Sequence, residues 1–185
     1  MPVFPTPPVP PSKLGIYRVL SSKAGVRLSP IALGGASIGD KLNKTHGEMT
    51  KESSYQLLDA YFDRGGNFID TANSYQLGSS EEFIGEWAEK RGIRDQLFIA
   101  TKYSMNWKRD DSVAQKTHFV GTNTKALHIS VEASLKKLRT SYIDLLYVHV
   151  WDFDSPVKEV MDALHNLVAQ GKVLYLARFS AAYHV

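Results

Sequence analysis

The stretch FIDTANSY, residues 68–75, joins an apolar run to polar side chains and sets the pattern for the whole chain. The run NFID (67–70) is bounded by glycines and turn residues, which is typical of a short buried strand. It ends on the carboxylate of Asp70, and the phenol of Tyr75 follows five residues later. Two interpretations fit: a strand that ends in a polar turn, or one half of an active site.

Apolar runs and helical periodicities alternate on both sides of this stretch. Further strands are expected over IALGGAS (31–37), LFIAT (97–101), DLLYVHV (144–150) and KVLYLARF (172–179). Apolar residues at helical spacing predict helices over residues 50–64, 79–90, 124–139 and 155–171. YRVLSSKAGVRLSP (17–30) predicts a β-hairpin that precedes this series.

Helix starts are also readable. We expect Thr50 to cap the first helix, a capping box of Ser79 and Glu82 to open the second, and Ser155 and Pro156 to open the fourth. Continuous apolar strands that alternate with amphipathic helices predict a parallel sheet covered by helices. An open doubly wound sheet and part of a (β/α)8 barrel both satisfy this pattern.

In both architectures ligands bind at the carboxyl ends of the strands, and three predicted strands bring an ionisable residue there. These residues are Asp70, Lys102 directly after LFIAT, and His149, while Tyr75 lies on the loop after Asp70. Each alone has an ordinary explanation: a turn carboxylate, a lysine at the rim, a structural histidine. Three on neighbouring strands favour a shared site.

These four side chains suit one kind of chemistry. An ammonium close to a phenol stabilises the phenolate, and a carboxylate keeps the buried ammonium charged. Tyr75 then serves as a proton donor near neutral pH, and a neutral imidazole holds a carbonyl oxygen beside it. Carbonyl reduction also needs a hydride, which a nicotinamide supplies because no protein group does.

The segments GGNFIDTANSYQLGSSEEFIGEW, LFIATKY and SYIDLLYVHVWD together resemble the aldo-keto reductase superfamily. The resemblance covers roughly residues 16–176 and is closest to the fungal aryl-alcohol dehydrogenase and norsolorinic acid reductase group. It implies a (β/α)8 barrel that binds NADP(H) without a Rossmann fold and acts on small, aromatic carbonyl or alcohol substrates.

The resemblance also implies a role for each motif residue. Tyr75 would be the general acid, Lys102 its partner, Asp70 the acid paired to the lysine and close to the nicotinamide ribose, and His149 the group that orients the carbonyl. Gly35 and Ala36 would lie against the cofactor. The aromatic residues Tyr103, Trp107 and Trp151 either wall a substrate pocket or pack within their loops.

The length sets a further expectation, because a (β/α)8 barrel takes roughly 250 residues and this chain has 185. We therefore expect an incomplete barrel of about five βα units over residues 15–185, after a Pro-rich disordered arm over residues 1–14. The end, ARFSAAYHV, departs from the family pattern. Weaker dinucleotide binding is an expected consequence. The open edge leaves three outcomes: a weakly stable half-barrel, an oligomer in which a second copy covers the edge, or a chain that folds poorly.

The composition limits the other function classes. The chain has a net charge of +3 without a basic block, no cysteine and no apolar run of membrane-spanning length. We expect a cytoplasmic protein that binds neither nucleic acid nor membranes. Two alternatives to the reductase remain: a catalytically inactive binding or regulatory relative, and a metal-dependent hydrolase with Asp70 and His149 as ligands.

Overall fold

The computed structural model describes residues 9–42 and 49–178 and contains two sheets. The larger sheet has five parallel strands in the order β3-β4-β5-β6-β7, and the smaller is the hairpin β1-β2. The strands are β1 (Arg18–Ser21), β2 (Ala24–Leu28), β3 (Leu33–Gly34), β4 (Phe68–Asp70), β5 (Phe98–Tyr103), β6 (Ile143–Val148) and β7 (Val173–Arg178).

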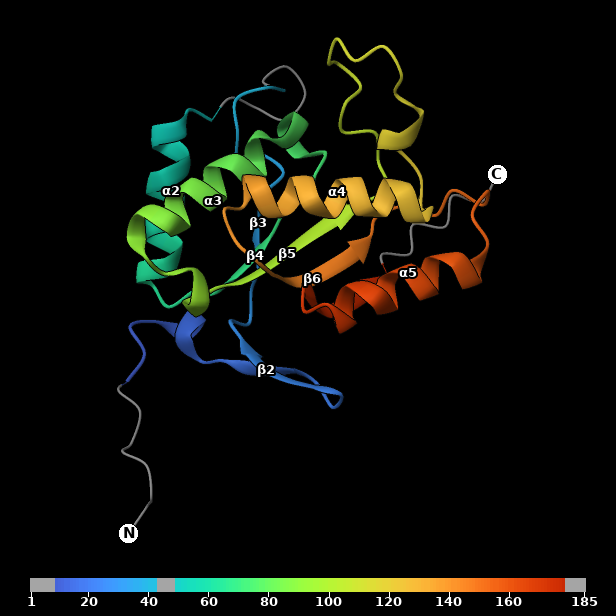
Figure 1. Cartoon of the computed structure of the whole chain (residues 1–185). Helices are drawn as coiled ribbons and strands as arrows, with labels where there is room; N and C mark the ends of the chain where they lie inside the picture. Colours follow the sequence, from blue (N-terminus) through green and yellow to red (C-terminus); the bar gives the residue numbers. More distant parts are fainter. Residues whose placement is uncertain (1–8, 43–48, 179–185) are drawn as a thin grey trace.

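Helices connect consecutive strands of the larger sheet and lie together on one side of it (Figure 1). They are α2 (Lys51–Asp63), α3 (Ser79–Arg91), α4 (Thr124–Lys137) and α5 (Val157–Ala169). Each strand pairs with the next one in the chain, so the topology is that of five strands and the four helices between them in a (β/α)8 barrel. The predicted barrel-type fold, incomplete and preceded by a hairpin, is confirmed.

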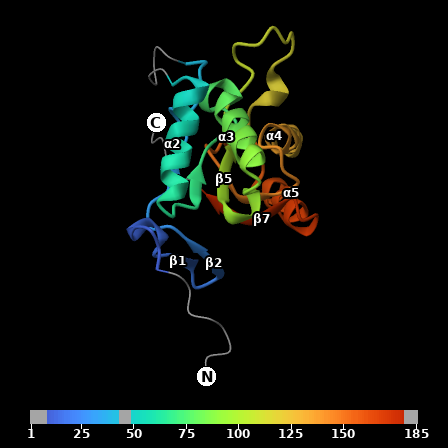
Figure 2. The ribbon, with the colours of Figure 1, turned by 90° about the vertical axis from the view of Figure 1, so that its left-hand side faces the viewer.

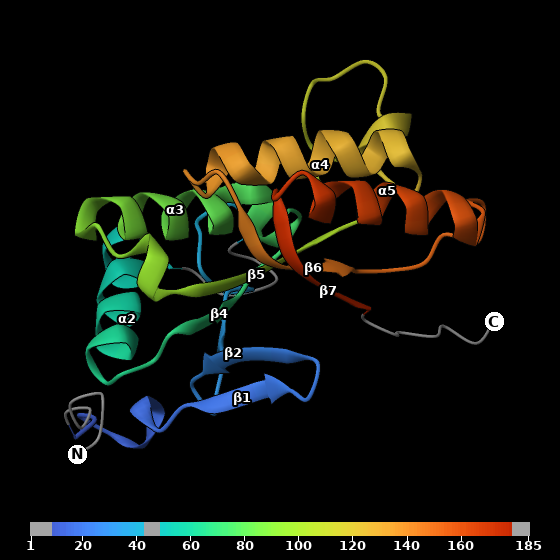
Figure 3. The ribbon, with the colours of Figure 1, turned by 60° about the horizontal axis from the view of Figure 1, so that its bottom comes forward.

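Side chains of β5 alternate between two buried layers. Ile99 and Tyr103 point toward the helices, and Phe98 and Ala100 share the opposite face of the sheet with Leu28 of the hairpin. Figures 2 and 3 show the hairpin on the side of the sheet away from α4 and α5. The hairpin therefore covers one end of the inner face, and the other end is left for polar residues.

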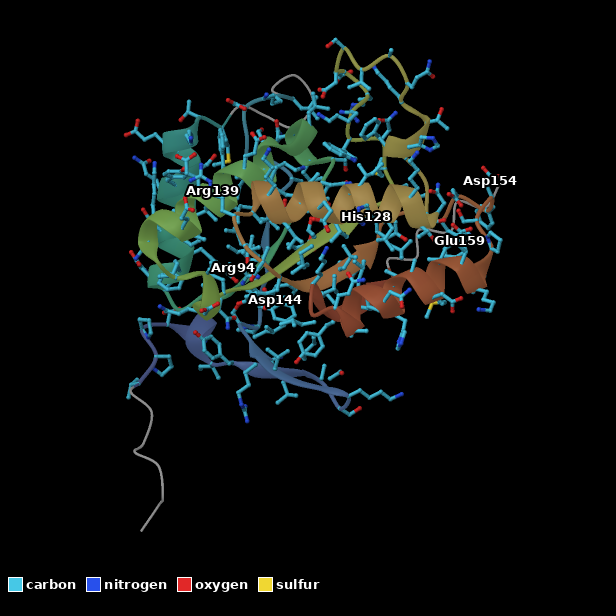
Figure 4. All side chains as sticks on the ribbon, in the orientation of Figure 1. Arg94, His128, Arg139, Asp144, Asp154 and Glu159 are labelled. Carbon is cyan, nitrogen blue, oxygen red and sulfur yellow. The ribbon has the colours of Figure 1, made fainter. Side chains whose placement is uncertain are left out.

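An ion pair closes the amino-terminal end of the sheet, near the hairpin. Arg94, on the short 3-10 turn Arg94–Gln96, lies 2.7 Å from the carboxylate of Asp144 near the start of β6 (Figure 4). Asp144 also accepts a hydrogen bond from the amide of Ile99, at 2.9 Å. Burial raises the pKa of Asp144, against the opposing effect of the Arg94 charge.

One of the three predicted helix starts is confirmed. The Thr50 hydroxyl accepts from the amide of Ser53 and caps α2. The capping box at Ser79 is wrong: α3 begins at Ser79 itself, behind Gly78 in a left-handed conformation. The Ser79 hydroxyl instead accepts from the Asp40 amide and donates to the Gln76 carbonyl, so contacts outside the helix take the place of the cap.

The start of α5 also differs from the prediction. Pro156 is the N-cap and Val157 the first helical residue, because the Ser155 hydroxyl and amide both bond to the Asp152 carboxylate. This carboxylate fixes the turn that leads into α5. No helix in the described part of the chain is long and apolar enough to cross a membrane.

Strand boundaries shift by a few residues. The first strand of the large sheet is only Leu33–Gly34, and β5 continues through Lys102 to Tyr103 rather than ending before the lysine. Of the predicted strand 172–179, the last residue lies outside the described ranges, as do residues 1–8 of the predicted arm. The boundary between that arm and the barrel domain at residues 14 and 15 stays a prediction.

Candidate active site

Lys102 lies at the centre of a polar cluster at the carboxyl end of the sheet. Its ammonium donates to the Asp70 carboxylate at 2.6 Å, to the backbone carbonyl of Thr71 at 2.9 Å and to the Tyr75 hydroxyl at 3.3 Å. Lys102 is only 4% exposed. Burying an ammonium costs free energy unless it is paired and hydrogen-bonded, and three oxygens supply these contacts.

Tyr75 is held against the lysine by the loop that leaves β4. Its amide donates to the carbonyl of Ala72 at 3.1 Å and begins the short 3-10 turn Tyr75–Gly78. The ammonium of Lys102 also lies 4.7 Å from the centroid of the Tyr75 ring. The half-buried phenol is therefore in contact with the positive charge through both its ring and its oxygen.

His149 follows β6 directly and completes the cluster. Its backbone amide donates to the carbonyl of Tyr103, and its ring lies edge-on to that of Tyr75 with 5.9 Å between centroids. Burial, followed by the charge of Lys102, lowers the pKa of His149, and Asp70 opposes this. The imidazole is therefore neutral at pH 7, with one N–H to donate and one nitrogen to accept.

The parallel register explains why the four predicted residues meet. Asp70 is the last residue of β4, and β4 pairs with β5 so that Asp70 lies opposite Ala100, two residues before Lys102. β5 in turn pairs with β6 so that Lys102 lies opposite Tyr147, two residues before His149. Since side chains two residues apart share a face, the three strands present their ionisable groups on the same side.

Gly35 and Ala36, predicted to lie against a cofactor, follow β3 at the same edge of the sheet. The amide of Gly35 donates to the carbonyl of Asp70 at 2.7 Å. A Cβ atom on Gly35 would lie 3.1 Å from both that carbonyl and the Ser80 hydroxyl, so this close approach favours glycine. Ala36 is half-buried, and its carbonyl accepts a hydrogen bond from the Gln76 side chain.

Two neighbours of the cluster were not predicted. Tyr147 is half-buried beside Lys102, with 5.6 Å from the ammonium to its ring centroid, and burial followed by the charge of Asp70 raises its pKa. The two-residue periodicity of β6, which places Tyr147 and His149 on one face, could have indicated it. Gln76, buried next to Tyr75, has no such signal because it lies on an irregular loop.

The three aromatic residues considered as pocket walls contact neighbouring side chains and loops. Tyr103 lies in the helix-facing layer, and its hydroxyl donates to the carbonyl of Thr122. Trp107 is buried edge-on to Phe119, with ring centroids 5.7 Å apart. Trp151 packs against the same layer as Tyr103. Ordinary packing therefore accounts for the buried Tyr103 and Trp107, and the role of the half-buried Trp151 as a pocket wall stays a prediction.

A metal centre has no support in the geometry. Asp70 uses its carboxylate on Lys102. Within residues 9–42 and 49–178, no three His, Cys, Asp or Glu side chains are grouped so that they could hold a metal ion. The hydrolase alternative, which needs such ligands, therefore lacks its site in the described residues.

Comparisons with known proteins identify the family of this chain. The profile of the Aldo/keto reductase family matches residues 30–181. The chain is 59% identical over 173 residues to an aryl-alcohol dehydrogenase [NADP(+)] of Phanerodontia chrysosporium, covering 91% of this chain and 45% of that protein. It is 54% identical over 170 residues to the norsolorinic acid reductase stcV of Emericella nidulans, covering 92% of this chain and 44% of that protein.

Among solved structures, the aldo-keto reductase AKR11C1 from Bacillus halodurans in its holo form shares the fold, with a TM-score of 0.74 and 24% identity over 89% of this chain and 50% of that chain. The chain thus spans about half the length of the proteins it matches. The family profile covers most of the sequence and includes all four residues of the cluster. The chain belongs to the aldo/keto reductase family.

Proposed function

We propose that this chain carries the reducing site of an NADP(H)-dependent oxidoreductase that interconverts aldehydes or ketones and alcohols. The observation that supports this most strongly is the shared contact of one buried ammonium with a carboxylate and a phenol. Lys102 lies 2.6 Å from Asp70 and 3.3 Å from the Tyr75 hydroxyl. This set of groups places a proton donor beside a positive charge, and carbonyl reduction requires such a donor.

In the proposed reaction Tyr75 gives its proton to the carbonyl oxygen as the carbon is reduced. The phenolate that remains is stabilised by the ammonium of Lys102, which lies within hydrogen-bond distance. Asp70 pairs with that ammonium at 2.6 Å. In the reverse reaction the same phenolate accepts the proton of the alcohol. Such general acid–base catalysis contributes roughly 10²–10⁴-fold to the rate.

His149 has a positioning task in this proposal. Because burial and Lys102 hold the pKa of His149 low, the ring is neutral and donates a single N–H. A hydrogen bond from that N–H to the carbonyl oxygen would fix the oxygen next to the Tyr75 hydroxyl. The edge-on arrangement of the two rings suits an oxygen that contacts both.

The residues present fit a nicotinamide cofactor. The cluster supplies a proton and no hydride, and the hydride is what NADPH provides when bound. Asp70, with its side chain 29% exposed, reaches the rim of the cluster, and Ala36 lies at the same edge of the sheet. We infer that Gly35, Ala36 and Asp70 contact the cofactor there. The printed name of the aryl-alcohol dehydrogenase, which specifies NADP(+), favours the phosphorylated form.

The names of the relatives also indicate the substrate class. One is an aryl-alcohol dehydrogenase and another a norsolorinic acid reductase, so we infer a small, aromatic carbonyl compound or alcohol as substrate. We infer a cytoplasmic location, because the sequence has no cysteine and disulfides are rare in that compartment. Leu174 and Leu176 of β7 are 46% and 38% exposed, and we infer that a second copy of the chain covers this edge.

The test is the oxidation of NADPH, followed by absorbance, in the presence of benzaldehyde-type substrates. The wild-type chain is compared with Tyr75→Phe and with the control Tyr142→Phe, which removes a phenol bonded to Asp95 away from the cluster. We expect Tyr75→Phe to lose activity and Tyr142→Phe to retain it. Equal, background rates for all three would favour the inactive regulatory alternative instead.

A further inference from the structure

The loop that carries Tyr75 has an unusual backbone. Gln76, Leu77 and Gly78 follow Tyr75 with φ angles of 49°, 54° and 98°, so three consecutive residues adopt the left-handed region. Two of these residues have a Cβ atom, which this region disfavours. Such a conformation persists where the surrounding contacts determine it, so the contacts of this loop indicate what holds Tyr75 in place.

The contacts come from the Gln76 side chain. It is 1% exposed, its Oε1 accepts from the amide of Leu42 at 2.7 Å, and its Nε2 donates to the carbonyl of Ala36 at 3.2 Å. Both partners belong to the segment that follows β3. One buried amide therefore joins the loop of the proposed proton donor to the segment that begins at Ala36, one of the proposed cofactor contacts.

Two neighbouring contacts reinforce this junction. The Ser79 hydroxyl accepts from the amide of Asp40 and donates to the carbonyl of Gln76. A Cβ atom on Gly39 would lie 2.6 Å from the Cβ of Gln76, so the two segments touch without space for a further side chain. Residues 36–42 and 75–79 are thus packed as one unit.

We propose that Gln76 is a positioning residue that couples the segment 36–42 to the loop of Tyr75, so that binding of the dinucleotide along the first also orders the second. The inference rests on the proposed function for its cofactor and its proton donor. A ligand that orders residues 36–42 lowers the cost of ordering Tyr75, and the coupling works equally in both directions. The phenol would then be aligned chiefly when the cofactor is present.

The chemistry of the side chain explains why an amide is suited to this position. One group must accept from a backbone N–H and donate to a backbone carbonyl, and glutamine does both. Glutamate would keep the acceptor and place a negative charge against the Ala36 carbonyl. Glycine would suit the left-handed backbone but lacks the side chain that bonds to Ala36 and Leu42. Gln76→Gly therefore removes these two hydrogen bonds without adding backbone strain.

The chain contains a matched control at the opposite end of β4. The Asn67 side chain accepts from the amide of Ser29 at 2.7 Å and donates to the carbonyl of Arg27 at 3.2 Å. It therefore makes the same pair of backbone hydrogen bonds to a neighbouring segment, away from the cluster. Asn67→Ala removes these bonds without touching residues 36–42 or 75–79.

The decisive experiment is amide hydrogen exchange on the full chain, for the wild type, Gln76→Ala, Gln76→Gly and Asn67→Ala. We expect both Gln76 variants to accelerate exchange of the Leu42 amide and of the Leu77 amide together, by roughly tenfold, as loss of buried hydrogen bonds implies. Asn67→Ala should accelerate only the Ser29 amide. The proposal is overturned if Leu42 accelerates and Leu77 does not, or if Asn67→Ala accelerates all three.

A second arm adds NADPH to the same samples and measures its affinity by tryptophan fluorescence. In the wild type, NADPH should slow exchange at both Leu42 and Leu77, and in Gln76→Gly it should no longer slow Leu77. Slowing of Leu77 to the same degree in both proteins would contradict the coupling. A wild type that does not bind NADPH refutes the proposed function, while the exchange rates without NADPH still decide whether Gln76 joins the two segments.

Discussion

Two buried ion pairs lie at opposite ends of the same sheet, and their surroundings differ. At the amino-terminal end Arg94 and Asp144 are 2.7 Å apart, with 15% and 10% of their side chains exposed. At the carboxyl end Lys102 and Asp70 are 2.6 Å apart, with 5% and 29% exposed. The nitrogen–oxygen distances of the two pairs are similar, so distance alone does not distinguish a structural ion pair from a functional one.

Their other partners distinguish them. Arg94 also donates to the Thr140 hydroxyl and to the carbonyls of Leu97 and Tyr142, and Asp144 accepts from a backbone amide, so this pair is closed by the fold itself. Lys102 instead donates to a phenol, and its carboxylate partner remains partly open to solvent. The first pair holds elements together, and the second leaves groups available to a ligand.

Replacing Lys102 is expected to have the largest effect of the substitutions that test this difference, and the effect is on the rate of reduction. Lys102→Met removes the charge that stabilises the phenolate, so the rate of NADPH-dependent reduction should fall by about 10²–10⁴-fold. Water can hydrate the partly exposed Asp70 carboxylate after its partner is removed. Lys102→Met should therefore lower the free energy of unfolding less than Arg94→Met does. Steady-state kinetics and urea denaturation measure the two quantities. An active Lys102→Met variant would remove the lysine from the proposed mechanism.

The opposite pair should respond in the opposite way. Arg94→Met leaves the buried Asp144 carboxylate without its partner, and such a loss costs about 3–5 kcal/mol of stability. The stability lost in Arg94→Met should be smaller at acidic pH. Burial already raises the pKa of Asp144, and protonation removes its uncompensated charge. Urea denaturation at two pH values measures it.

Arg139→Met is the matched control for that substitution. Arg139 pairs with Glu86 and Glu89 on the surface, with 41% of its side chain exposed (Figure 4). Such exposed pairs contribute about 0–1 kcal/mol. Equal losses for Arg94→Met and Arg139→Met would mean that the pair at the amino-terminal end is no more structural than a surface pair.

His149 gives a smaller effect that depends on pH. Its pKa in the folded protein lies below the ordinary value of 6.5, so the unfolded chain binds the proton more readily. Its contribution to stability is therefore fully present above 6.5 and is lost as the pH falls through the folded pKa. Histidine titrates between roughly pH 7.5 and 5. Over this range the free energy of unfolding, measured by heat or urea, should fall with decreasing pH, and His149→Gln should reduce that slope. His165→Gln, at an exposed position, should leave the slope unchanged.

Much of the site follows from regular structure and could be predicted. Asp70, Lys102 and His149 come from strands whose parallel pairing and two-residue alternation place them on one face. Thr50 was a correct cap because its hydroxyl bonds within the helix that it opens, accepting from the amide of Ser53 and donating to the Ser53 side chain. The apolar period of each element and the alternation of strands and helices along the chain are patterns that a single sequence records.

The remainder depends on contacts between distant residues. Ser79 does not act as a capping box because Asp40 engages its hydroxyl, and Gln76 acquires its role from Ala36 and Leu42. Tyr103 was considered as a pocket wall because β5 was expected to end at residue 101. Once the strand continues to Tyr103, alternation with Lys102 directs the ring toward the helices.

The central claim is that Tyr75 and Lys102 act as one proton-donating unit, and a double-mutant cycle tests it most directly. The rate of NADPH-dependent reduction is measured for the wild type, Tyr75→Phe, Lys102→Met and the double variant. Residues that act as a unit are non-additive, so the double variant should be no slower than the slower single variant. Rate losses that multiply in the double variant would contradict the claim.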